Sequence, residues 1–157
     1  HGNAILSEKP FIDWRNINIS CLSFSRRGIL HGKNSDKINL LCVHLGLFER
    51  ERKLQIQRLI DYVKNNIPPS EPLILAGDFN DWRHRSHKLL VETLGLKESY
   101  LESQGVLPKT YPAFFPALAM DRIYSRGFEV VQSQMLEGGN WRRMSDHSGL
   151  LAELTLK

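Results

Sequence analysis

The feature that most limits the fold is an amphipathic helix pattern set between two apolar runs, residues 38–45 and 73–76. Between the runs, apolar residues recur at the spacing of one helix face. These residues are Ile56, Leu59, Ile60 and Val63. Pro68 and Pro69 then end the pattern, because proline cannot continue a helix. The strand-helix-strand order predicts a mixed α/β sandwich.

Other segments predict further strands and a second helix. Short apolar or alternating runs predict strands at residues 3–7, 17–24, 27–31, 122–124, 128–132 and 149–156. Turn residues at 32–37 predict a hairpin loop. A second helix is expected at residues 86–94, ending at Gly95, which suits a left-handed cap. From Phe128 onward the pattern is typical of antiparallel β structure.

Composition narrows the class of protein. The chain has 157 residues and 41% hydrophobic residues, so residues 1–157 are expected to form a single domain with a real core. A net charge of +4 suits a phosphate-bearing partner but is low for a dedicated nucleic-acid scaffold. Cys21 and Cys42 lack metal-type spacing and are predicted to be core thiols.

No apolar run approaches the roughly 18 residues of a membrane span. We therefore expect a soluble, cytoplasmic protein without a transmembrane segment. The chain opens on HGNAILS, without an initiator methionine, so an export signal further upstream remains an open alternative.

A polar cluster follows the second apolar run. The stretch LILAGDFNDW places Asp78 and Asn80 two positions apart, so their side chains point to one side if the backbone stays extended past Gly77. A carboxylate can ligate a hard cation or take a proton from water, while an amide can hold water or a phosphoryl oxygen. The alternative is an Asx-rich turn that closes the strand.

Three more clusters could carry chemistry. His44 lies late in an apolar strand, and Asp121 opens another strand, where it could accept the ring N–H of an imidazole. Asp146 and His147 can approach one site together only from a bend or strand edge. Each also has an ordinary alternative: a satisfied histidine, a surface aspartate paired with Arg122, or a capping aspartate in a turn.

The clusters occur in the order V-H-L, G-D-F-N, D-R-I-Y, S-D-H. This ordered set resembles the endonuclease/exonuclease/phosphatase superfamily, the deoxyribonuclease I-like metal-dependent phosphoesterases. It is most similar to the bacterial hydrolase branch written HLG...GDFNDW...DRIY...SDH. Further matches are GNAILS, residues 27–30, and Arg52 and Gln55 on the helix after His44. The resemblance implies a deoxyribonuclease I-like four-layer sandwich, of which this chain is the carboxy-terminal portion.

The resemblance also implies roles for the site residues. His44 would contact the scissile phosphate, while Asp78 and Asn80 would orient or activate the attacking water. Asp121 would hold His147, which would stabilise the phosphoryl oxygens or transfer a proton. A phosphodiester attacked in line develops charge on its oxygens, which a cation and histidines can neutralise.

The metal assignment is less complete. The resemblance implies that Asp146, with Asp78, binds Mg²⁺ (or Mn²⁺). However, the family's amino-terminal half, which supplies its principal metal-binding Glu, is absent from these 157 residues. Because Mg²⁺ usually takes one or two protein carboxylates plus water, we expect the two aspartates alone to bind it weakly.

The expected function is that of a Mg²⁺-dependent phosphoesterase, most simply a phosphodiesterase acting on nucleic acid or phospholipid. The alternative is a catalytically impaired remnant that binds phosphate-containing ligands or a partner protein. Aromatic and basic residues beside the motifs could stack on bases and contact phosphates, and the alternative is that they merely line the rim of the cleft. These are Trp82, Trp141, Arg83, Arg85, Arg142 and Arg143. An apolar hairpin would favour lipid, and residues 113–118 are a candidate for one.

Overall fold

The structure, a computed structural model, describes residues 2–22 and 24–157. Along the chain these form β1 (Phe11–Asn18), β2 (Gly28–Asn34), β3 (Asn39–His44), α1 (Glu49–Asn66), β4 (Leu73–Asp78), α2 (Arg85–Leu94), β5 (Lys97–Glu98), α3 (Ser99–Gln104), β6 (Asp121–Arg126), β7 (Phe128–Leu136), α4 (Trp141–Met144) and β8 (Gly149–Leu156). The chain is therefore mixed α/β, as predicted.

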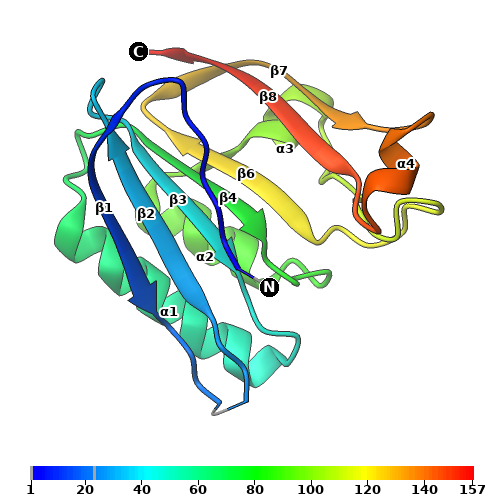
Figure 1. Cartoon of the computed structure of the whole chain (residues 1–157), viewed down its shortest axis with the longest axis horizontal. Helices are drawn as coiled ribbons and strands as arrows, with labels where there is room; N and C mark the ends of the chain where they lie inside the picture. Colours follow the sequence, from blue (N-terminus) through cyan, green and yellow to red (C-terminus); the bar gives the residue numbers. More distant parts are fainter. Residues whose placement is uncertain (1, 23) are drawn as a thin grey trace.

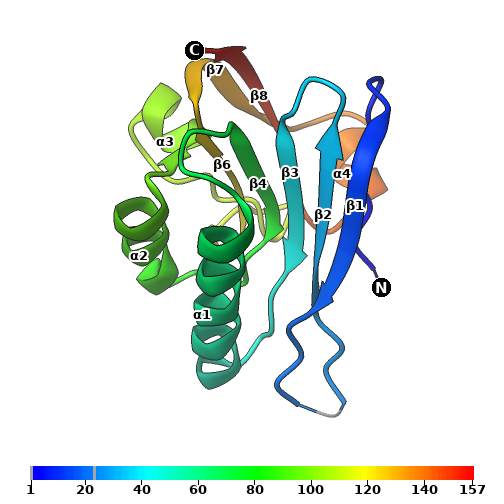
Figure 2. The ribbon, with the colours of Figure 1, turned by 90° about the vertical axis from the view of Figure 1, so that its left-hand side faces the viewer.

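The larger sheet has the strand order β1-β2-β3-β4-β6-β5 (Figure 1). Its β3 and β4 are parallel and are connected through α1, while its other pairs are antiparallel. α1 and α2 lie together on one face of this sheet (Figure 2). β7 and β8 pair antiparallel as a separate hairpin that contacts β6. Within the part of the chain that the structure describes, much of the other face of the larger sheet is not covered by a helix.

The core lies between α1, α2 and the larger sheet. The four apolar residues of the predicted helix stripe are at most 2% exposed and pack against sheet residues such as Leu41, Val43 and Leu75. Burying each such side chain contributes about 1.5–3 kcal/mol. α2 ends as predicted, with Gly95 at φ +64° donating its N–H to the Val91 carbonyl. Both predicted helices are confirmed.

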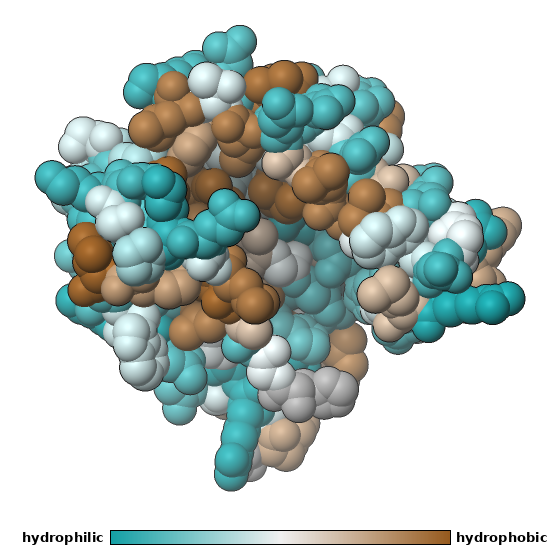
Figure 3. All heavy atoms as spheres, turned by 45° about the horizontal axis from the view of Figure 1, so that its top comes forward, coloured by the Kyte–Doolittle hydropathy of each residue, from teal (hydrophilic) through white to brown (hydrophobic). Residues whose placement is uncertain are grey.

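The opposite face of the larger sheet carries a second apolar row. Leu30, Cys42, Ala76 and Ile123 are neighbours in the register of β2, β3, β4 and β6. All four are only half-buried. Figure 3 shows apolar side chains around a hollow on this side of the molecule. Cys42 thus lies on this half-open face rather than in the core, and Cys21 is also half-buried.

Two predicted strands are wrong. Residues 3–7 form no strand, and instead the Asn3 side chain donates to the carbonyls of Gly28 and Cys42 at 2.8 and 3.0 Å. The strand expected at 17–24 is displaced to β1, and residue 23 lies outside the described residues. β1 is an edge strand, so most of its side chains face water and give no apolar alternation.

The hairpin between β2 and β3 is shorter than predicted. β2 continues to Asn34, which takes in part of the loop expected at residues 32–37. The Asn34 side chain then closes the turn by accepting the backbone N–H groups of Asp36 and Ile38 at 3.1 and 3.0 Å. Among the described residues, no helix combines the length and apolar character needed to cross a bilayer.

Candidate active site

Three neighbouring strands place His44, Asp78 and Asp121 in one row. His44 of β3 is opposite Asp78 of β4, and Asp78 is opposite Asp121 of β6. Opposed positions in a sheet point to the same face. That face is the one away from α1, because the preceding residue Val43 lies in the core beneath the helices. The register therefore brings together three of the predicted site residues.

Asp78 and Asn80 meet through a turn rather than through an extended strand. β4 ends at Asp78, and Asn80 has φ +50°, so the backbone does not stay extended and the alternative of an Asx turn is the one that forms. The Asp78 Oδ1 accepts the Asn80 backbone N–H at 2.8 Å, and its Oδ2 accepts the Asn80 Nδ2 at 3.1 Å. Asn80 also donates to the Leu45 carbonyl at 2.9 Å. The Asx turn is thus what holds the carboxylate at the end of β4.

Glycine is required just before this turn. Gly77 has φ +140°, and a Cβ there would lie 1.9 Å from the Val43 carbonyl oxygen. A side chain would push β4 away from β3 and disturb the neighbouring register of His44 and Asp78. In this register the His44 Nε2 lies 3.4 Å from the Asp78 Oδ2.

Asp121 and His147 are hydrogen-bonded to each other. The His147 Nδ1 lies 2.8 Å from the Asp121 Oδ2, and the Tyr111 ring lies against the imidazole at 4.8 Å. Thr110 donates its hydroxyl to the same Asp121 oxygen at 2.6 Å and accepts the Asp121 backbone N–H at 3.2 Å. Sequence reasoning missed Thr110, since an isolated neutral hydroxyl gives no charge or spacing signal.

The surroundings move the pKa values of the two histidines apart. The hydrogen bond that His147 donates to Asp121 raises the pKa of His147 above its ordinary 6.5. Burial, followed by the charge of Arg27, lowers the pKa of His44. Burial and the neighbouring Asp121 raise the pKa of Asp78. At neutral pH the site therefore favours a neutral His44 beside a His147 that holds its proton more tightly.

This difference predicts an order of titration. We expect His147 to titrate at a higher pH than His44 in an NMR titration of the imidazole C–H signals, and Asp121→Asn to lower the His147 midpoint. The pKa of His147 is higher in the folded protein than in the unfolded chain, where it is about 6.5. The Asp121–His147 pair therefore adds its full contribution to the free energy of unfolding below pH ~6.5, and this contribution is lost as the pH rises through the pKa of His147 in the folded protein. A His44 midpoint above that of His147 would contradict the assignment.

The resemblance assigns Asp146 to metal binding. Its side chain is exposed, and its backbone carbonyl accepts the Ala113 N–H at 2.8 Å. Within residues 2–22 and 24–157, no three or more His, Cys, Asp or Glu side chains are grouped to hold a metal ion. Both Asp78 oxygens already accept hydrogen bonds from Asn80. The residues present therefore do not by themselves form a Mg²⁺ site.

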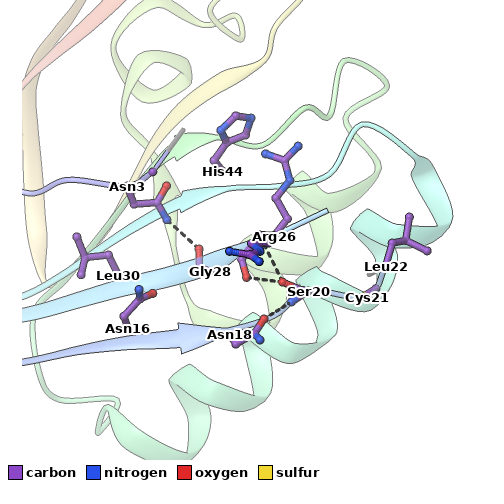
Figure 4. A pocket seen from close by; sticks show the side chains of 12 residues that line it. Asn3, Asn16, Asn18, Ser20, Cys21, Leu22, Arg26, Gly28, Leu30 and His44 are labelled. Atoms are coloured by element: carbon purple, nitrogen blue, oxygen red, sulfur yellow. Dashed lines mark hydrogen bonds between the residues drawn. The ribbon is translucent and has the colours of Figure 1, made fainter. Parts of the chain in front are cut away.

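A polar hollow of about 770 Å³ adjoins the row at His44 (Figure 4). It opens between the segment at Asn3 and the ends of β1 and β2, and its charged lining is cationic. The side chains available to bind an anion or hydroxyl groups are Asn16, Asn18, Ser20, Arg26 and Arg27. The sequence analysis singles out His44, residues 27–30 and the segment at Asn3, but it gives no role to the rest of this lining.

The aromatic and basic residues beside the motifs divide into two groups. Arg83 and Arg85 pair with Glu49, and Trp82 lies under the Arg52 guanidinium at 5.0 Å. These residues are thus engaged with α1. Trp141, Arg142 and Arg143 are exposed on α4, close in the chain to His147.

Residues 1–147 match the model of the Endonuclease/Exonuclease/phosphatase family, and the chain belongs to this family. It is 37% identical over 161 residues to the uncharacterized protein YbhP of Escherichia coli, with 99% of this chain and 63% of YbhP covered. The chain thus spans less than two thirds of that relative's length.

Solved structures share the fold. A functionally unknown conserved protein from Enterococcus faecalis has a TM-score of 0.78 at 21% identity, covering 94% of this chain and 67% of that one. The mannosyl-6-phosphatase Bt3783 of Bacteroides thetaiotaomicron has a TM-score of 0.73 at 20% identity, covering 96% and 68%. At these identities the likeness supports the fold, and the deoxyribonuclease I-like architecture expected from the sequence is confirmed.

Proposed function

We propose that the chain carries the catalytic row of a phosphoesterase that hydrolyses phosphodiesters. The observation that carries this proposal is the in-register row of His44, Asp78 and Asp121, with His147 bonded to Asp121. Membership of the family supports a hydrolase of the nuclease or phosphatase type. The cationic hollow beside His44 supports an anionic substrate.

Each side chain has a chemical task in this proposal. Asp78 accepts a proton from the attacking water as a general base. Asn80 fixes the Asp78 carboxylate and thereby the position of the water. His147 keeps its proton and donates to an oxygen on which charge develops, while His44 contacts the phosphate beside it.

We further propose that the full-length protein uses Mg²⁺ or Mn²⁺, with Asp78 and Asp146 supplying part of the ligand set. The remaining ligand would come from the family's amino-terminal portion, which would also cover the half-open apolar face at Leu30, Cys42 and Ile123. The coverage of 63% of YbhP leaves room for such a portion. The ion would supply positive charge for the developing oxyanion.

The second candidate is a remnant that binds phosphate-containing ligands without turnover. It is favoured by the lack of a metal-holding cluster among the described residues. Assaying the protein expressed from its whole coding sequence separates the two, with bis-p-nitrophenyl phosphate as substrate and Mg²⁺ present. We expect clear turnover of the diester. Binding of inorganic phosphate with no turnover above buffer would favour the remnant.

Thr110 provides a further test of the row. We expect Thr110→Val to lower kcat for the diester by about tenfold, because Asp121 loses a partly buried hydrogen bond worth ~1–3 kcal/mol. Thr110→Ser keeps the hydroxyl and should retain most of the activity. Steady-state kinetics and the NMR titration of His147 would be measured on both variants. Equal activity of both would show that Thr110 does not position Asp121.

A further inference from the structure

Two segments next to His147 form one protruding surface. The loop 111–118 is closed by the pairing of Tyr111 with Leu118, and the Ala113 N–H donates to the Asp146 carbonyl at 2.8 Å, which ties this loop to the end of α4. Tyr111 in turn lies against His147. Figure 1 shows α4 and this loop projecting together from the body of the molecule. The surface is therefore anchored at the candidate active site.

This surface exposes large apolar side chains. Phe114, Phe115 and Met144 are 75%, 71% and 72% exposed, and Trp141 is 49% exposed. We call these four residues the apolar rim. Single exposed apolar side chains are common on protein surfaces. Here four large ones lie on two segments that a backbone hydrogen bond joins, and such a group indicates a binding surface.

The rim is accompanied by positive charge. Arg142 and Arg143 lie in α4 between Trp141 and Met144, and both are exposed. In the projecting lobe of Figure 3, hydrophobic and hydrophilic side chains lie next to one another. Tryptophan favours the boundary between lipid headgroups and water, and arginine can bury its stem while its guanidinium stays at the phosphates. An anionic lipid surface can interact with both, because the apolar rim can enter the headgroup layer while the two arginines contact the lipid phosphates.

A nucleic acid fits this surface less well. Single-stranded nucleic acid is bound by a basic groove that follows the backbone, with rings that stack on successive bases. Here the cations are two adjacent arginines, and Met144 has no ring to stack on a base. Arg83 and Arg85, which could have extended a basic track, are paired with Glu49. The apolar content of the rim therefore favours lipid over bases.

We propose that the apolar rim, with Arg142 and Arg143, docks on the surface of a bilayer that contains anionic phospholipid. Docking would bring phospholipid phosphodiesters to the face that carries His147. This catalytic consequence rests on the proposed function, whereas the docking itself does not.

The docking is tested by cosedimentation of the full-length protein with vesicles of phosphatidylcholine, alone or mixed in equal parts with phosphatidylglycerol. We expect binding to the mixed vesicles, and a loss of about tenfold or more in the double variants Phe114→Ser/Phe115→Ser and Arg142→Gln/Arg143→Gln. Phe24→Ser is the matched control, because Phe24 is 78% exposed but lies in the turn between β1 and β2. It should bind as the unaltered protein does.

The outcomes separate docking from catalysis. The absence of vesicle binding by the unaltered protein, or equal losses in Phe24→Ser and Phe114→Ser/Phe115→Ser, would overturn the docking. Loss of single-stranded oligonucleotide binding in the rim variants, with vesicle binding unchanged, would assign the surface to nucleic acid instead. Turnover of soluble bis-p-nitrophenyl phosphate should be unchanged in the rim variants. Vesicle binding by a protein that does not turn over bis-p-nitrophenyl phosphate would contradict the proposed function but would still support the docking.

Discussion

Asp78→Asn is expected to lower kcat for diester hydrolysis by about a hundredfold or more, since general base catalysis typically contributes 10²–10⁴-fold. Asparagine keeps the shape of the side chain and can still accept the Asn80 backbone N–H, but it cannot take a proton from water. Its amide nitrogen would also meet the Asn80 Nδ2, which now donates to the Asp78 Oδ2 at 3.1 Å. Initial rates and the Tm would be measured together.

The neighbouring carboxylate gives the matched control. Asp81 is buried, and it accepts the backbone N–H groups of Arg85 and Ser86 at 3.2 and 2.7 Å, at the start of α2. Asp81→Asn should lower the Tm, because it weakens this contact to the helix start, and should change kcat little. A normal kcat in Asp78→Asn, or an equal loss in both variants, would contradict the assignment of Asp78 as proton acceptor.

The sequence predicts the helices and central strands well, because their signals are local. Ile56, Leu59 and Val63 mark the buried face of α1, and Gly95 marks the end of α2. β1 escapes prediction because, as the edge strand of the larger sheet, it buries little of either face. Asn3 escapes it for a different reason, since its two carbonyl partners lie on other strands and leave no local pattern.

The sequence predicts which residues belong to the candidate site but not how they are arranged. The positions of His44, Asp78 and Asp121 at strand ends are visible in the sequence, yet their common row depends on the pairing of β4 with β6, which are distant in the chain. The link between Thr110 and Asp121 depends on the fold in the same way. The turn at Asn80 was foreseen only as an alternative to a functional role, whereas the same turn positions the candidate base.

Metal removal should have the largest effect. We expect hydrolysis by the full-length protein to require Mg²⁺ or Mn²⁺ and to fall to the background rate in EDTA. The reason is that the row lacks positive charge. A phosphodiester under attack gains negative charge. The row itself contains two carboxylates and His44, and the lowered pKa of His44 favours its neutral form. Zn²⁺ should not replace these ions, because the candidate ligands Asp78 and Asp146 are hard oxygen donors.

An assay of the 157-residue chain alone tests whether its own carboxylates are enough to bind Mg²⁺ and support turnover. With only Asp78 and the exposed Asp146 to offer, it should bind Mg²⁺ weakly by calorimetry and turn over the diester at least about tenfold more slowly than the full-length protein. Robust Mg²⁺-dependent turnover by this chain would show that the two aspartates suffice. Full-length activity indifferent to EDTA would remove the metal-dependent phosphoesterase assignment itself, because the row would then need another source of positive charge.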